Sequence, residues 1–317
     1  MTLDVSVIIP TFNRAHLLPR TLRSVLAQTY RNFEIVLIDD ASTDYTQEIM
    51  CETFNQEMDS GLIRYIRNDV NHERSKSRNK GVSLAKGEYI AFLDDDDIWL
   101  PDHLALLVSF LENNQTVGCV FGKPAWIFED GLVVDKFQML FPEMKAGSGS
   151  FYNDACLRGN MVFSPSSLLK RCVIEKIGGF REDISQNEDW EFFSRVAMNF
   201  EIGYVNMVTC CFYVHQGTHS KLVVGQGAYI KEKVLKIIEG NAIKDNYQIN
   251  NKVRGFVYLT LSRDFIPLMN KSREYLLKAF KADPLLALDL SVWALVFRIM
   301  LGRGVYDKIK YIKGLMR

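Results

Sequence analysis

Short apolar runs alternate with amphipathic segments through the first 120 residues of the chain. Residues 5–9 form a β-branched apolar run that Pro10 ends, a pattern typical of a strand buried on both faces of a parallel sheet. Over residues 15–28 the apolar side chains recur at helical spacing, and residues 34–40 are again apolar and strand-like. These three segments predict a β-α-β unit.

The same alternation predicts further elements as far as residue 121. We expect helices near residues 45–54, over 75–85 and from Pro101 onward, and strands over 63–66, 89–93 and 117–121. Such a series predicts an α/β fold in which helices flank a mostly parallel, Rossmann-like sheet. Ligands of these sheets bind in the crevice beyond the carboxyl ends of the strands.

Beyond residue 122 the alternation breaks. The pattern there predicts a hairpin over 126–134, an irregular loop over 141–150, a helix over 188–199 and a strand over 204–214. From about Gly225 every periodic segment is helical. We therefore expect an α/β domain over residues 1–220, which carries the chemistry, and a smaller helical region over 221–317.

Composition excludes several classes of protein. The chain has 38 basic and 38 acidic side chains, and 12% of its residues are aromatic. A nucleic-acid binder normally shows basic excess and a disordered chain has few aromatics, so neither class fits and no nucleic-acid partner is expected. The six cysteines lack CxxC spacing, and the apolar run at 5–9 is too short for a signal peptide. We expect a reducing, cytoplasmic setting.

Four aspartates, residues 94–97, follow the strand predicted at 89–93. Because alternate residues of a strand project to the same side, Asp94 and Asp96 could share one metal ion in the crevice. Carboxylate oxygens suit Mg²⁺ or Mn²⁺, and phosphate oxygens usually complete the shell of such an ion. The alternative is a solvated loop in which one aspartate caps the next helix.

Polar residues also end the first two predicted strands, namely Pro10, Thr11 and Asn13 after the first and Asp39 and Asp40 after the second. An aspartate at such a position can accept a hydrogen bond from a ribose hydroxyl or a base N–H, which would make the ligand a nucleotide. The Asp-Asp pair is equally typical of a turn followed by a helix cap at Ser42 or Asp44.

The segment 71–81 could hold the phosphates of that nucleotide. The sequence contains no P-loop motif, whereas this segment carries Arg74, Lys76 and Arg78. The alternative is an exposed basic start of a helix.

Seven motifs together resemble the family 2 glycosyltransferases, which are inverting enzymes with the GT-A fold. In chain order they are VSVIIPTFNR (5–14), SVLAQTY (24–30), EIVLIDDASTD (34–44), SRNKG (77–81), GEYIAFLDDDD (87–97), GGFRED (178–183) and NEDWEFFSRV (187–196). Each motif alone is weak, but seven in the family's order are highly specific.

The resemblance implies roles for individual residues. It implies that Pro10, Thr11 and Asp40 contact the nucleobase and ribose, that Arg78 approaches the diphosphate, and that residues 94–96, including Asp95, form a DXD-type site. Asp96 matches the principal metal ligand, and His215 is a candidate third ligand. Asp189 matches the catalytic base, although a Glu188-Asp189 pair is also ordinary in the first turn of a helix.

The expected activity is transfer of one sugar from a nucleotide diphosphate donor, UDP-linked, to a hydroxyl of a glycan or lipid-linked glycan in surface polysaccharide or glycoconjugate synthesis. The absence of a QxxRW motif after residue 187 argues against a processive synthase. One departure is that residues 72–74 read His-Glu-Arg where the family commonly has a glycine. The alternatives are a sugar nucleotidyltransferase and a noncatalytic nucleotide-sugar-binding scaffold protein.

Basic and apolar residues interleave at the end of the chain, where Asp307 is the single acid among Arg298, Arg303, Lys308, Lys310, Lys313 and Arg317. This pattern is typical of a helix on an anionic membrane surface, which would make the protein peripheral on the inner face of the cell membrane. The alternative is a packed helix with a solvated basic face.

Overall fold

The computed structural model describes residues 4–135, 137, 144–159, 161–215, 226–265, 268–289, 292, 293, 295, 296 and 299. Its contacts divide the chain into two compact units. The first comprises residues 1–156 and 160–219, and the second comprises residues 157–159 and 220–317.

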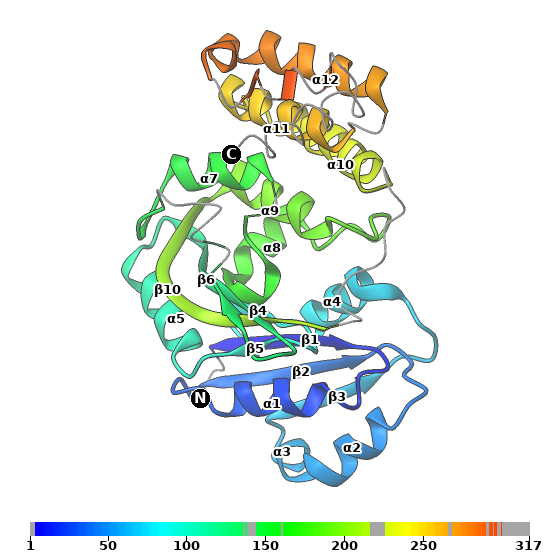
Figure 1. Ribbon diagram of the computed structural model, residues 1–317. Helices are drawn as coiled ribbons and strands as arrows, with labels where there is room; N and C mark the ends of the chain where they lie inside the picture. Colours follow the sequence, from blue (N-terminus) through cyan, green and yellow to red (C-terminus); the bar gives the residue numbers. More distant parts are fainter. Residues whose placement is uncertain are drawn as a thin grey trace. The chain divides into compact units, whose positions relative to one another are not determined.

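A twisted sheet forms the centre of the first unit (Figure 1). Its strands are β1 (Val5–Thr11), β2 (Phe33–Asp39), β3 (Ile63–Arg67), β4 (Tyr89–Phe92), β5 (Ile98–Trp99), β6 (Val117–Phe128), β7 (Val133–Val134), β8 (Gly147–Ser148), β9 (Ser167–Lys170) and β10 (Glu201–Val214). The main order is β3-β2-β1-β4-β9-β6-β10-β5, with β7 paired to β6 and β8 to β10. Strands β3, β2, β1 and β4 are parallel, as are β6 and β10, whereas β9 runs antiparallel to β4 and β6.

The helices before residue 200 are α1 (Leu18–Leu26), α2 (Thr46–Thr53), α3 (Asn55–Asp59), α4 (Glu73–Leu84), α5 (His103–Asn113), α7 (Ser150–Arg158), α8 (Arg171–Ile177) and α9 (Glu188–Asn199), with a 3-10 turn η1 at Ser164–Ser166. Figure 1 shows α1 and α4 on opposite faces of β1 and β2. All seven residues of β1 are buried, because both of its faces are covered.

The two faces of β1 pack differently. Val7 and Ile9 join the core that contains Leu18 and Leu22 of α1. On the other face, a Cβ atom added to Gly81 of α4 would lie 2.4 Å from Cγ2 of Ile8. The glycine of the SRNKG motif therefore lets α4 approach the sheet closely.

Most predicted elements are present, and several elements that were not predicted are present as well, such as α7, α8 and β9. Strand β6 continues to Phe128, because its far end pairs with β10 and, through the predicted hairpin, with β7. Helix α3 was not predicted, since Asn55–Asp59 has no apolar periodicity. Pro101 precedes α5 instead of starting it, and its carbonyl accepts a hydrogen bond from Thr29 N at 2.8 Å.

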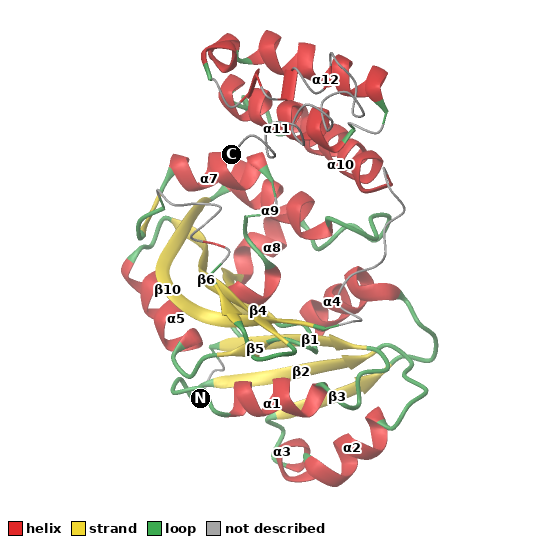
Figure 2. Cartoon of the chain, in the orientation of Figure 1, coloured by secondary structure: helices red, strands yellow, loops and turns green. Residues whose placement is uncertain are grey.

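The described elements of the second unit are all helices (Figure 2): α10 (Gln226–Lys244), α11 (Asn251–Asp264), α12 (Met269–Ala282) and the 3-10 helix η2 (Pro284–Leu288). Ser262 and Ser272 join α11 to α12 by reciprocal hydrogen bonds, since each Oγ donates to the other's carbonyl at 2.8 and 2.7 Å. None of the helices among the described residues is both long and apolar enough to cross a membrane. Residues 300–317, which include most of the basic C-terminal stretch, lie outside the described residues.

Candidate functional site

The carboxyl ends of β1, β2 and β4 meet at one edge of the sheet. Thr11 pairs with Asp39 in the parallel register, and the next residue, Asp40, donates its N–H to the Thr11 carbonyl at 2.8 Å. Asn13 joins the loops that follow these strands: its N–H donates to Ser42 Oγ at 2.9 Å, and its Oδ1 accepts Thr43 N at 2.7 Å. The predicted nucleotide-binding residues of the first two strand ends therefore lie together.

The adjacent aspartates 39 and 40 have different surroundings. Asp39 is fully buried and accepts hydrogen bonds from Ser42 N at 2.8 Å and Tyr65 Oη at 2.5 Å. Asp39 therefore stabilises the turn after β2, which was the alternative to a binding role. Asp40 faces the loop after β3, where it accepts Asn68 Nδ2 at 2.7 Å and His72 N at 3.0 Å. Sequence reasoning missed Asn68 and His72, because nothing in the motifs indicates which loop meets Asp40.

The four aspartates do not continue β4. The strand ends at Phe92 and the chain turns at residues 95 and 96, so the alternation that would put Asp94 and Asp96 on one side does not apply. We call residues 95–97 the acidic turn. Its backbone is held by α1, where Thr21 Oγ1 donates to the carbonyls of Asp95 and Asp97 at 3.0 and 2.7 Å, and Arg20 Nη2 to that of Asp96 at 2.7 Å.

Helix α1 also holds the residues just beyond the acidic turn. Ser24 Oγ accepts Trp99 N at 3.1 Å. The amide of Gln28 donates to the Leu100 carbonyl at 2.8 Å and accepts Leu104 N at 3.0 Å. One face of α1, together with Gln28 just beyond the end of the helix, therefore fixes the path of the chain from residue 95 into α5.

Burial and mutual repulsion raise the pKa of two carboxyls of the acidic turn. For Asp95, desolvation and the charge of Asp96 raise the pKa to about 7. For Asp97, the same two causes raise the pKa well above its usual range, although its Oδ1 accepts Tyr213 N at 3.0 Å. The solvated-loop alternative does not describe this turn, since none of its residues is exposed.

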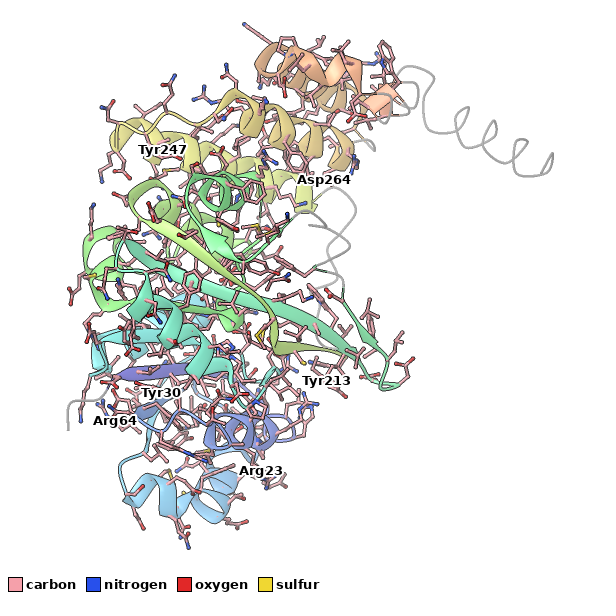
Figure 3. All side chains as sticks on the ribbon, turned by 90° about the vertical axis from the view of Figure 1, so that its left-hand side faces the viewer. Arg23, Tyr30, Arg64, Tyr213, Tyr247 and Asp264 are labelled. Atoms are coloured by element: carbon pink, nitrogen blue, oxygen red, sulfur yellow. The ribbon has the colours of Figure 1, made fainter. Side chains whose placement is uncertain are left out.

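Asp96 lies beside His215, with Oδ2 and Nε2 3.1 Å apart. The His215 ring stacks on Tyr213 at 5.6 Å between centroids, and the guanidinium of Arg20 lies 3.9 Å from the Tyr213 centroid. Tyr213 is labelled at the end of β10 in Figure 3. The stack holds the imidazole against the acidic turn.

Asp96 and His215 fit part of a divalent-metal site. Carboxylate oxygen and imidazole nitrogen together suit Mn²⁺, and an ion with few protein ligands leaves positions for phosphate oxygens. In the part of the chain that the structure describes, no three His, Cys, Asp or Glu side chains gather closely enough to form a complete site. Asp94 instead forms an ion pair with Arg78.

Arg78 lies at the centre of a second group. Its fully buried guanidinium donates from Nη2 to Asp94 at 2.7 Å, and from Nη1 to Asp189 at 2.9 Å and Glu188 at 3.4 Å. We call these four residues the Arg78 cluster. Although desolvation opposes ionisation, Arg78 and Arg74 hold the pKa of Asp94 below its usual range.

The two acidic residues of the Arg78 cluster from α9 differ in their contacts. Asp189 accepts Arg78 and Ser164 Oγ at Oδ1, the latter at 2.8 Å, and Ser164 N at Oδ2 at 3.2 Å. Desolvation and the charge of Asp189 raise the pKa of Glu188, whose Oε1 lies 3.4 Å from the exposed Arg74. Asn187, which precedes both acids, adopts a left-handed φ of 57° that turns the chain into α9.

The SRNKG and GGFRED motifs meet in space. Asn79 accepts Phe180 N at Oδ1 and donates from Nδ2 to the Phe180 carbonyl, both at 2.8 Å. A Cβ atom at Gly179 would lie 2.3 Å from Asn79 Oδ1, so this contact requires glycine. The Phe180 ring lies 5.0 Å from the Arg78 guanidinium. The GGFRED loop thus covers the Arg78 cluster.

The basic segment 71–81 divides between two faces of α4. Arg78 faces the carboxylates, whereas Lys76 and Lys80 line a separate cavity of about 370 Å³ with Asn68, His72, Asn79, Ser83 and Glu182. Glu73, within the His-Glu-Arg departure, has a φ of 68°. The backbone therefore keeps a conformation that favours glycine although the residue is glutamate.

The family model described as Glycosyl transferase family 2 matches residues 6–166 of the chain. The chain belongs to glycosyltransferase family 2. The matched residues include the ends of β1, β2 and β4, Arg78 and the acidic turn. The prediction of the family is confirmed, and the sugar nucleotidyltransferase alternative is set aside.

Two relatives of this glycosyltransferase are bacterial enzymes with assigned names. The chain is 29% identical over 225 residues, 67% of its length, to the putative colanic acid biosynthesis glycosyl transferase WcaA of Escherichia coli K12, covering 73% of that protein. It is 35% identical over 153 residues, 48% of its length, to the Escherichia coli UDP-Glc:alpha-D-GlcNAc-diphosphoundecaprenol beta-1,3-glucosyltransferase WfaP, covering 58% of that protein.

Solved structures share the fold. TarS of S. aureus, residues 1–349 in complex with UDP-GlcNAc, matches with a TM-score of 0.71 at 19% identity, over 97% of this chain and 92% of that one. The mannosyltransferase PcManGT of Pyrobaculum calidifontis, in complex with GDP-Man and Mn²⁺, matches with a TM-score of 0.60 at 20% identity, over 98% and 84%. The glycosyltransferase has the predicted GT-A fold with C-terminal helices.

Proposed function

We propose that this family 2 glycosyltransferase moves a single sugar from a nucleotide diphosphate donor to an acceptor hydroxyl, with inversion at the anomeric carbon. One observation carries the proposal: the Arg78 cluster joins Asp94, at the donor-side strand end, to Asp189 through a single guanidinium. In a direct displacement, the base and the donor-binding residues must lie on opposite sides of the anomeric carbon of one sugar. A shared contact with the Arg78 guanidinium would keep the two at a fixed separation.

The donor side of the proposal rests on the strand-end residues. We assign nucleotide-sugar binding to Pro10, Thr11, Asn13, Asp40, Arg78, Asp94 and Asp95. UDP is the proposed nucleotide, supported by the UDP-GlcNAc complex of TarS and the UDP-Glc donor in the name of WfaP. The GDP-Man complex of PcManGT makes GDP the competing choice.

A divalent cation, Mn²⁺ or Mg²⁺, is the proposed cofactor. Asp96 and His215 would hold it, with Asp94 as a further candidate, and diphosphate oxygens would complete its shell. When bound, the cation supplies positive charge that stabilises the departing diphosphate. The stack of Arg20 and Tyr213 on His215 orients the imidazole for this role.

Asp189 is the proposed base. Its carboxylate accepts the proton of the acceptor hydroxyl as the hydroxyl oxygen attacks the anomeric carbon. Arg78 and Ser164 donate hydrogen bonds to this carboxylate, which hold it in place for the proton transfer. A single displacement by the acceptor inverts the anomeric centre.

We propose a glycan or lipid-linked glycan as the acceptor, in surface polysaccharide synthesis. The names of WcaA and WfaP, which refer to colanic acid and to a diphosphoundecaprenol-linked sugar, support this class. With such an acceptor, the protein would work in the cytoplasm at the inner face of the cell membrane. Residues 221–317 would then contact the membrane or a partner.

The test begins with the purified protein and three donors, UDP-glucose, UDP-N-acetylglucosamine and GDP-mannose, each with and without Mn²⁺. Thermal shift identifies the donor that binds, and nucleoside diphosphate release then measures turnover. We expect one UDP-sugar to bind more tightly with Mn²⁺ and to release UDP. Binding without turnover for any acceptor would favour the noncatalytic scaffold alternative.

A further inference from the structure

Ser164 directs both of its donors to one carboxylate. Its Oγ donates to Oδ1 of Asp189 at 2.8 Å, and its backbone N–H donates to Oδ2 at 3.2 Å. The serine is fully buried, so water does not compete for these bonds. A two-point contact of this kind fixes the rotation of the carboxylate plane, which one hydrogen bond alone does not.

The turn that carries Ser164 is itself anchored. The Pro165 carbonyl accepts Trp99 Nε1 at 2.7 Å, and Ser167 Oγ donates to the Ser164 carbonyl at 2.9 Å. Strand β9, which follows η1 directly, pairs with β4 and β6. Ser164 is therefore positioned by the sheet, as a group that must hold a reactive carboxylate to a fraction of an ångström should be.

The hydrogen bonds of Asp189 distinguish its two oxygens. Among the described residues, Oδ1 accepts two hydrogen bonds, from Arg78 and Ser164 Oγ, whereas Oδ2 accepts one, from Ser164 N. A carboxylate oxygen has two lone-pair sites, so Oδ2 keeps one for an incoming proton. The Asp189 side chain is 13% exposed, so part of it is accessible to solvent.

We infer that Ser164 is a positioning residue that presents Oδ2 of Asp189 to the acceptor hydroxyl, an inference that rests on the proposed function. In the step, the acceptor proton moves to Oδ2 while the acceptor oxygen bonds to the anomeric carbon. The bond from that carbon to the diphosphate oxygen breaks, and its electron pair leaves with the nucleoside diphosphate. Without the Ser164 hydroxyl, Oδ1 would keep the hydrogen bond from Arg78 and Oδ2 the one from Ser164 N, so two donors in place of three would hold the carboxylate and it would depart more easily from this alignment.

The experiment compares Ser164→Ala with Ser164→Cys, and uses Ser166→Ala as the matched control. Ser166 lies in the same turn and is equally buried, but its Oγ donates to the Phe163 carbonyl at 2.9 Å and not to Asp189. Turnover is measured as nucleoside diphosphate release in the presence of Mn²⁺, with water as the acceptor. The donor is whichever of UDP-glucose, UDP-N-acetylglucosamine and GDP-mannose gives the largest thermal shift. Donor affinity is measured separately by titration calorimetry.

We expect Ser164→Ala to lower kcat by about 10- to 100-fold, because a small misplacement of a reacting group costs rate on this scale. The donor KM and Kd should stay within about threefold, since Ser164 does not touch the donor side. Ser164→Cys keeps the volume but offers only a weak S–H donor, so its kcat should fall between those of serine and alanine. Ser166→Ala should stay within about twofold of the unmodified protein.

Asp189→Asn, measured in parallel, separates the two hypotheses. If Asp189→Asn retains full turnover, the base assignment of the proposed function is wrong. If Asp189→Asn loses turnover while Ser164→Ala matches Ser166→Ala, the positioning role is overturned. A kcat for Ser164→Cys equal to that of the unmodified protein would also overturn the positioning role. If Ser164→Ala fails to fold, the comparison of Ser164→Cys with the unmodified protein tests this role instead.

Discussion

Two groups of carboxylates lie along the same edge of the sheet, and the protein compensates their charge in opposite ways. In the Arg78 cluster, three acids surround one buried guanidinium, and the pKa of Asp94 falls below its usual range. In the acidic turn, desolvation and the charge of Asp96 raise the pKa of the neighbouring Asp95 to about 7. Adjacent residues of one sequence motif thus experience opposite electrostatic environments.

The difference indicates where the protein supplies a positive charge to its carboxylates and where a bound ligand would have to supply it. The Arg78 cluster contains its own cation, the buried guanidinium that pairs with Asp94 and Asp189. In the acidic turn, burial and mutual repulsion disfavour ionisation of Asp95 and Asp97. The neighbouring His215 can ligate a cation but compensates a carboxylate fully only when it is protonated. A divalent ion would supply the missing compensation, which is why we place the proposed cofactor beside Asp96 and His215, with Asp94 as the further candidate ligand, and not at Glu188 and Asp189.

The largest effect should follow from removing the proposed base. Asp189→Asn preserves the shape of the side chain but cannot accept the acceptor proton, so turnover should fall by about 10²- to 10⁴-fold. Nucleotide-sugar binding with Mn²⁺ should persist, because the acidic turn is unchanged. Nucleoside diphosphate release and calorimetric titration measure the two quantities, and equal losses in both would show that Asp189 serves binding instead.

The second effect concerns the buried cation at the centre of the Arg78 cluster. Arg78→Ala leaves three partly or fully buried acids without their central cation, and the free energy of unfolding should fall by about 3–5 kcal/mol. Arg74 provides the control, since its side chain is 59% exposed and faces two of the same acids. Arg74→Ala should cost less than about 1 kcal/mol in urea unfolding. Similar losses for both variants would contradict the distinction drawn here between a buried and an exposed cation.

A third, smaller effect should appear at the acidic turn. Asp96→Ala should weaken Mn²⁺-dependent donor binding by about 10- to 100-fold while changing stability little, because it removes one proposed ligand and relieves like-charge repulsion. Asp102→Ala, at an exposed carboxylate beyond the turn, is the control. The measurement is the Mn²⁺-induced increase in donor affinity. An unchanged increase in Asp96→Ala would move the cation site elsewhere.

The smallest effect concerns the segment that leads into the Arg78 cluster. Glu73 has a φ of 68°, where a side chain costs about 1–2 kcal/mol relative to glycine. Glu73→Gly should therefore raise the free energy of unfolding by up to about 1 kcal/mol, part of the gain being lost to the greater freedom of unfolded glycine. Lys76→Gly, in the interior of the same helix, should instead lower it by about 1 kcal/mol. Chemical denaturation would compare them, and a loss in both variants would refute the conformational explanation.

The sequence predicted those features that periodicity controls. Helix α9 begins and ends at the predicted residues, and β1 is buried on both faces as its apolar run indicates. The strand ends followed from the same patterns, because polar residues begin where the apolar runs stop. The resemblance to family 2 glycosyltransferases then indicated candidate binding residues at these strand ends.

Periodicity could not predict what happens after a strand stops. Asp94 and Asp96 diverge because the backbone between them turns, and no spacing rule indicates that one acid meets Arg78 and the other His215. Ser164 was missed for a related reason: its contact with Asp189 joins residues 25 positions apart through tertiary packing, and the surrounding sequence carries no catalytic motif. The site residues gain their partners from loop paths, which depend on the whole fold.

The hydrogen bonds from α1 to the backbone of the acidic turn have a consequence for how the side chains of the turn could change during evolution. Thr21 and Arg20 hold carbonyl groups, which every amino acid possesses, so this part of the anchoring does not depend on the identity of the side chains of the turn. Replacing Asp96 would therefore alter the ligands offered to a cation while these three hydrogen bonds to the backbone remain. Helix α1 would therefore allow the preference for the proposed cation to change by a single substitution at Asp96 while it keeps its hold on the backbone of the turn.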